Sequence, residues 1–172
     1  MAETLRRTDP TCAVIRDTRN LIKKQIGAGA TFHLDAAETA RQITSANATD
    51  LDTSLALVNE LRAKYALHIG ADNAGDGMAH KAQDATNTVA AAVATSLATA
   101  ITLANEIKVD YTAHIASTTF HHNADATNTV AAADATDQTS LNTLVNELKA
   151  DLNAHMASAP TNAAPSIRLV DA

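Results

Sequence analysis

The chain has 172 residues, of which 46% are hydrophobic but only 2% aromatic, and its formal net charge is −6 at pH 7. Much of the apolar content is alanine, which favours helices and buries little area per residue, so the composition predicts an all-α protein with a thin core. The single cysteine, Cys12, excludes an intramolecular disulfide and a cysteine-based zinc site.

Residues 1–31 are predicted to form a basic arm ahead of an acidic body. Asp9 and Pro10 are typical of a helix start, and Gly27 of its end. We expect the arm to anchor the chain to an acidic protein surface, although a solvated helix face would give the same pattern. Nucleic acid is a less favoured partner, because no aromatic residues interleave the basic ones and the body is acidic. The basic side chains of the arm are Arg6, Arg7, Arg16, Arg19, Lys23 and Lys24.

The beginning of the chain has no apolar leader, and no stretch approaches the roughly eighteen apolar residues of a membrane span. We therefore expect neither a signal peptide nor a transmembrane segment.

The body repeats one pattern in three units, residues 32–69, 78–116 and 120–157. An Asn-Glu pair followed by histidine occurs in each unit, and the block Asp-Ala-Thr-Asn-Thr-Val at 84–89 returns letter for letter at 125–130. Self-similarity of this kind indicates stacked supersecondary units rather than one enzymatic core. The Asn-Glu pair is interpreted as a polar contact that sets the register between helices, or as part of a solvated face.

Each unit is predicted to end in a long helix, because apolar residues recur there at i, i+3 and i+4. The third helix should cover about residues 136–156, with Asp134 or Asp137 as its N-cap. The connectors of about twenty residues are long enough to return to the starting end, so we expect roughly parallel helices; an up-down bundle with long corner loops is the alternative. Asp84 or Asp125 is expected to cap a short helix in its connector, unless the connectors form extended turns.

Residues 158–172 interrupt the pattern with a polar, proline-punctuated tail that ends in β-type residues. Such a tail either adds to the edge of a neighbour's sheet, through Ile167 and Leu169, or stays disordered. The sequence thus predicts an all-α helical bundle of three tandem helix-plus-connector repeats, flanked by an N-terminal arm and an extended C-terminal tail.

The histidines fall at repeat-related places. His80 and His121 each precede an aspartate by four residues, and Asp110 precedes His114 by four, which places each pair on one face of a helix. A divalent cation, zinc or a similar ion, is one interpretation. The favoured alternative is structural, with histidines at helix ends that bond orphan carbonyls and with Asp110 and Asp151 orienting them. The candidate metal ligands are His80, Asp84, His114, His121, His122 and Asp125.

The repeats resemble tandem repeats in virion structural proteins of tailed bacteriophages. The likeness covers residues 78–157 well and residues 32–69 more weakly, where Glu-Thr-Ala-Arg-Gln-Ile at 38–43 takes the place of the repeated block. It implies a capsid decoration, a head–tail neck component or a fibre-like attachment, located in the virion and assembled in the host cytoplasm. Other virion proteins and further copies of this chain would then be its partners. No catalytic motif is present, so an enzyme is not expected.

Overall fold

The structure is a computed structural model that describes residues 41–71, 80, 82–121 and 123–158. This part of the chain contains three α-helices and no strand: α2 (Leu51–Ile69), α3 (Leu97–Ala116) and α4 (Gln138–Ala157). The all-α prediction is therefore confirmed for the described residues. The basic arm with Arg6, Arg7, Arg16, Arg19, Lys23 and Lys24 lies outside them, as do His122 and the tail residues Ile167 and Leu169.

The three helices begin with the same device. In each, the N-cap side chain accepts a hydrogen bond from the backbone N–H three residues on, and the hydroxyl at that position reaches back to the N-cap backbone. The N-caps are Asp50, Ser96 and Asp137, so Asp137 takes the role that the sequence predicted for it. These reciprocal bonds fix where each helix starts, which sets the position of every later side chain along its axis.

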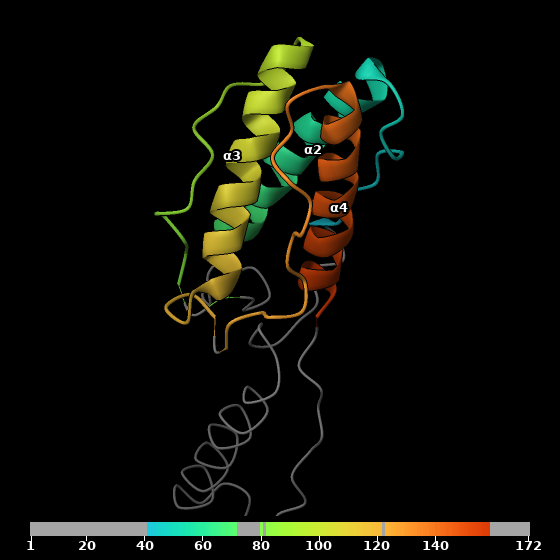
Figure 1. Ribbon diagram of the computed structural model, residues 1–172. Helices are drawn as coiled ribbons and strands as arrows, with labels where there is room; N and C mark the ends of the chain where they lie inside the picture. The colour runs from blue at the N-terminus through green and yellow to red at the C-terminus, as the bar shows by residue number, and fades with distance from the viewer. Residues whose placement is uncertain (1–40, 72–79, 81, 122, 159–172) are drawn as a thin grey trace, which may run out of the picture.

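The three helices run parallel and each packs against the other two (Figure 1). The core lies along their shared axis and is built from the apolar stripes that the sequence predicted. Tyr65 and Tyr111 are the largest fully buried side chains, and their hydroxyls donate to the backbone oxygens of Asn87 and Asn128. Helices of this length span about 30 Å, so one end of the core is well separated from the other.

The described connectors are extended and contain no helix, so the short capped helices expected after Asp84 and Asp125 do not form there. Each connector instead returns along the outside of the helices, and its backbone is held by their side chains (Figure 1). Asn105 of α3 exchanges two hydrogen bonds with the backbone of Ala135, at 2.8 and 3.0 Å. Glu147 of α4 accepts hydrogen bonds from the backbone N–H groups of Ala131 and Ala132, which lie earlier in the same connector.

We call this arrangement, in which an asparagine and a glutamate from two helices bond the backbone of one connector, a clamp. The same clamp holds the other two connecting segments. Asn59 with Glu106 binds residues 90–94, whereas Asn146 with Glu60 binds residues 44–48. The last of these bonds joins α4 to the segment that enters α2, which closes a ring of three equivalent clamps. The Asn-Glu pairs therefore bind connector backbone rather than a neighbouring helix. The extended connectors do not pair in a sheet, so their backbone N–H and C=O groups need side-chain partners.

None of the described helices combines the length and the hydropathy that a membrane crossing requires.

Candidate metal centre

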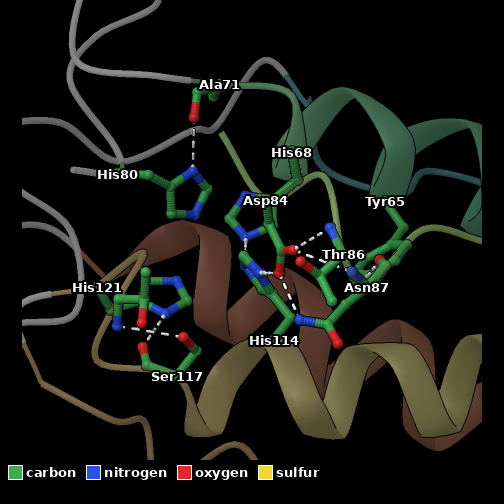
Figure 2. Close-up of polar contacts among 11 residues, drawn as sticks. Tyr65, His68, Ala71, His80, Asp84, Thr86, Asn87, His114, Ser117 and His121 are labelled. Atoms are coloured by element: carbon green, nitrogen blue, oxygen red, sulfur yellow. Dashed lines mark hydrogen bonds and ion pairs between the residues drawn. The ribbon is translucent and has the colours of Figure 1, made fainter. Parts of the chain in front are cut away.

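Five histidines meet at the end of the core where all three helices terminate. His68, His114 and His155 lie in the last turns of α2, α3 and α4, whereas His80 and His121 lie in the segments that follow α2 and α3. All five are completely buried, and one ring nitrogen from each lies within 4.8 Å of the others. Figure 2 shows four of them, His68, His80, His114 and His121, gathered around one point. The convergence follows from the parallel helices, which bring equivalent positions to the same end.

The orientation of the rings is fixed by oxygen atoms around the cluster. Nδ1 of His114 lies 2.8 Å from Asp84 Oδ2, and Nδ1 of His155 lies 2.8 Å from Asp125 Oδ2. Nδ1 of His80 lies 2.9 Å from the backbone oxygen of Ala71. Since carbonyl and ionised carboxylate oxygens only accept, these Nδ1 atoms carry the proton and donate.

His121 follows the same rule, with Nδ1 3.2 Å from the backbone oxygen of Ser117 (Figure 2). In a neutral imidazole with its proton on Nδ1, the other nitrogen, Nε2, offers a lone pair. Nε2 of His114 lies 3.1 Å from Nε2 of His68, and Nε2 of His80, His121 and His155 is buried. The cluster therefore presents several imidazole lone pairs to a common point.

Burial favours the neutral form of three of the imidazoles, those of His80, His114 and His155. It lowers the pKa of His80 to about 3, with the neighbouring His114 adding to the effect. Burial also lowers the pKa of His114 and of His155, against the opposing influence of Asp84 and Asp125. Neutral imidazole is the form that binds a metal ion, so these three rings are already suited to bind one at neutral pH.

The two carboxylates beside the cluster are held in their ionised form. Burial by itself would raise the pKa of Asp84, but hydrogen bonds from His114, Asn87 and Thr86 outweigh it and lower the pKa below its usual value. Asp125 has the equivalent bonds from His155, Asn128 and Thr127, with the same result. The repeated block thus forms a turn around its first residue, an aspartate, and the carboxylate of that aspartate also accepts a hydrogen bond from a histidine of the next helix.

The end of the core is electrostatically suited to a cation. Three parallel helices place their C-termini here, where each macrodipole has the equivalent of about half a negative charge. The two buried carboxylates add to that negative potential. A cation at the centre of the histidines is therefore favoured by charges that the fold has already brought together.

The structure brings together three of the predicted ligands, His80, His114 and His121. Asp84 and Asp125 lie next to the cluster and bond the outer nitrogens of its histidines, while His122 lies outside the described residues. The cluster also contains two histidines that sequence reasoning left out of the site. These are His68 and His155, which are the repeat equivalents of His114 and could have been found by applying the repeat to parallel helices.

The expected orienting role of Asp110 and Asp151 is wrong. Although each lies one turn before a clustered histidine, the Nδ1 atoms of His114 and His155 bond Asp84 and Asp125 of the connectors instead. Spacing along one helix could not reveal this, because the actual acceptor lies 30 residues away from its histidine.

Comparison with known proteins gives no match to a protein-family model, to a curated protein or to a solved structure.

Proposed function

We propose that this chain is a structural module whose three-helix body is locked at one end by a buried divalent metal ion. The observation that carries this proposal is the group of five buried histidines with ligand atoms within 4.8 Å of one another. The Nε2 atoms of His68 and His114 lie 3.1 Å apart, a distance that needs a proton or a cation between them. An ion such as zinc would bind these two nitrogens and those of the other three histidines together.

The charge of the surroundings supports a divalent ion. Asp84 and Asp125 are buried and ionised, and the imidazoles that they contact are neutral when no metal is bound. Hydrogen bonds keep both carboxylates ionised despite their burial, so this end of the core has two negative charges beside neutral imidazoles. A doubly positive ion balances them, and hydrogen bonds from the ligand histidines to carboxylates also strengthen the ligands.

The position of the ion explains what it would do. The ligands come from α2, α3, α4 and both segments that return from the helix ends, so one ion joins every described element at that end. A metal bound only by the folded chain stabilises it by about 4 kcal/mol when its free concentration is a thousand times its Kd. In a core with few aromatic residues this contribution is large relative to total stability.

The test is to purify the full chain, measure bound metal by mass spectrometry of the elements, and follow thermal unfolding with and without chelator. We expect about one divalent transition-metal ion per chain and a lower melting temperature after chelation, restored by adding the ion back. His114→Gln should lose the ion. Asn105→Ala is the matched control, because it weakens a clamp in the middle of α3 but keeps all five histidines and should keep the metal. A metal-free protein whose melting does not respond to added transition metals would overturn the proposal.

We further propose that the module is a structural component of a virion, as a capsid decoration, a head–tail neck component or a fibre-like attachment. The tandem repeat and its resemblance to virion repeats support this assignment. It implies a protein without catalytic activity, whose partners are other virion proteins and further copies of itself. The basic arm (1–31) and the tail beyond Ser158 would supply the docking contacts.

Deletion of residues 1–26 tests the anchoring role. The truncated chain should keep its helices and its metal, yet fail to join the particle when it replaces the full chain during assembly. Normal incorporation of the truncated chain would remove the arm from the assembly contacts, and absence of the full chain from purified particles would contradict the virion assignment itself.

A further inference from the structure

We infer that the histidine centre holds its ion in six-coordinate, octahedral geometry, and therefore selects Fe²⁺, Co²⁺ or Ni²⁺ over tetrahedral Zn²⁺. This inference rests on the proposed metal-binding function and specifies the ion. It follows from the number of ligands, from their spacing, and from the way the five rings are arranged around one another.

The number and the spacing of the ligand atoms argue against a tetrahedral site. Structural zinc takes four ligands, whereas five imidazoles converge here. With metal–nitrogen bonds of about 2.1 Å, neighbouring ligands of an octahedron lie about 3.0 Å apart and opposite ones about 4.2 Å, while all pairs of a tetrahedron lie about 3.4 Å apart. The Nε2 atoms of His68 and His114 are separated by 3.1 Å, and the whole set spans up to 4.8 Å. The close pair matches neighbouring positions of an octahedron, and a span of up to 4.8 Å accommodates the opposite ones.

The rings form two layers. His68, His114 and His155, from equivalent positions of the three helices, make a triangle with ring centroids 5.0, 5.0 and 5.8 Å apart. His80 lies against His68 and His114, at 4.6 and 5.0 Å. His121 lies against His114 and His155, at 4.5 and 5.1 Å. Each connector histidine thus sits over one edge of the helix triangle.

A second layer placed over the edges of a triangle is the staggered arrangement of an octahedron. In it, His80 stands opposite His155, and His121 stands opposite His68. The vertex opposite His114, over the edge between His68 and His155, takes a sixth ligand from outside these five histidines. The approximate threefold repetition of the chain, with parallel helices and equivalent clamps, is what generates this geometry.

The kind of ligand narrows the choice of ion further. Imidazole suits zinc, copper, iron and nickel, whereas magnesium and calcium prefer oxygen ligands and Cu(I) prefers sulfur. Zinc has no geometric preference from its d electrons and gains nothing from an octahedral cage. Ions that favour six nitrogen ligands bind more tightly to a preformed site, because the fold has already ordered the rings.

The test loads the metal-free full chain with Co²⁺ alone and records its visible absorption, because six-coordinate Co²⁺ absorbs weakly and tetrahedral Co²⁺ intensely. We expect one equivalent to bind with weak bands. X-ray absorption of the Ni²⁺-loaded chain should show six light-atom neighbours with five imidazoles among them, and Ni²⁺ should exceed Zn²⁺ in the protein after equilibration with equal amounts of both.

Two variants use the repeat as an internal control. His80→Ala and His121→Ala each remove one connector ligand at equivalent positions, so both should weaken Co²⁺ binding at least tenfold and alter its spectrum in the same way. Asn59→Ala, which touches only the clamp at residue 94, should leave the spectrum unchanged. Stoichiometric binding with intense tetrahedral bands, or with four neighbours by X-ray absorption, would overturn the octahedral inference and leave metal binding intact. No binding of Co²⁺, Ni²⁺ or Zn²⁺ would overturn both.

Discussion

Four of the five clustered histidines bond an oxygen atom through Nδ1: His80, His114, His121 and His155. The carboxylates of Asp84 and Asp125 use one oxygen for the turn N–H groups and the other for histidine Nδ1. The same side chain thus shapes a local turn and fixes a tautomer far along the chain. Outer partners of this kind orient metal ligands and raise their basicity.

Replacement of Asp125 by asparagine separates these two roles. An amide cannot accept both from the turn N–H groups and from His155, since one of its two ends is a donor. We expect Asp125→Asn to lower metal affinity about 10- to 100-fold, the usual loss for such a partner. Competition with a chromophoric chelator would measure it. Asp134→Asn is the control, because Asp134 is exposed and pairs with Lys108 away from the histidines. Equal affinities in both variants would show that Asp125 does not position the ligand.

Asp151 gives the metal-free protein a dependence on pH. Its Oδ2 atom is buried without a hydrogen-bond partner, and burial, Glu147 and Asp125 raise the pKa from 3.8 to about 6. The folded chain therefore binds this proton more tightly than the unfolded chain, so the stability associated with this group falls as pH rises from about 4 to about 6. Above that window the buried charge is a constant penalty.

Asp151→Asn should remove this penalty, since an amide does not ionise. In chelator, we expect the variant to be more stable than the unchanged chain at pH 7 and to lose that advantage at pH 4. Urea unfolding at a series of pH values would measure the difference. An advantage that stays constant between pH 4 and pH 7 would show that the effect of the substitution is not electrostatic.

At the scale of the elements, the paired clamp is what fixes the connectors without a sheet. An asparagine of one helix and a glutamate of the next hold the same extended segment, and this occurs three times. In one of the clamps, hydrogen bonds from residues 44 and 45 outweigh burial and lower the pKa of Glu60 to about 2. The clamps bind the connectors about ten residues after His80 and His121, whose rings bond the backbone oxygens of Ala71 and Ser117 instead.

Asn105→Ala tests the clamp. It leaves a backbone N–H and a carbonyl of half-buried connector without their partner, which should lower the free energy of unfolding by about 1–3 kcal/mol. Denaturant unfolding would measure the loss. Thr112→Ala is the comparison, since its hydroxyl bonds only the backbone of its own helix at an exposed site and its removal should change stability by less than about 0.5 kcal/mol. Similar losses in the two variants would remove the clamp's stabilising role.

The helices were largely predictable from sequence and the connectors were not. Local signals give the caps and apolar stripes, so the third helix was expected at 136–156 and is found at Gln138–Ala157. The connectors have no such local signal, because their hydrogen-bond partners lie on helices at least 15 residues away along the chain, for example 15 and 35 residues away for residues 91 and 94. The sequence left open a short helix or an extended turn after Asp84. Its carboxylate does bond the N–H groups of Thr86 and Asn87, but the connector then stays extended because Glu106 and Asn59 bond its backbone at residues 90–94.

The candidate site was predictable in part. Repeat spacing pointed to His80, His114 and His121, which the structure brings together. The predicted ligand set omits His68 and His155, because the spacing between histidine and aspartate does not reveal which helix ends meet in the folded chain. The equivalent position of a histidine in each repeat, together with parallel helices, therefore predicts the cluster better than the neighbours of each histidine in the sequence.

On the scale of the whole molecule, the two ends of the helical core are stabilised differently. The N-terminal end has a capping box on each helix, whereas the C-terminal end has the buried histidines and carboxylates. The ring of clamps is closed by bonds between residue 48 and Asn146, and bonds between residue 43 and Asn153, across 110 residues, reinforce it. Contacts so distant in sequence form at a high entropic cost, and an ion near them offsets part of that cost.

Hydrogen exchange should therefore reveal a local effect of the metal. Loading the chain with its ion should slow amide exchange in the last turns of α2, α3 and α4, where His68, His114 and His155 lie, and leave the first turns unchanged. Mass spectrometry of peptides from the two ends of each helix would measure the contrast with the chelated chain. Since all three helices supply a ligand, their C-terminal peptides should gain protection at the same metal concentration. Protection confined to one helix would contradict a shared ion, and equal protection at both ends would show that the ion acts on global unfolding rather than on this end of the core.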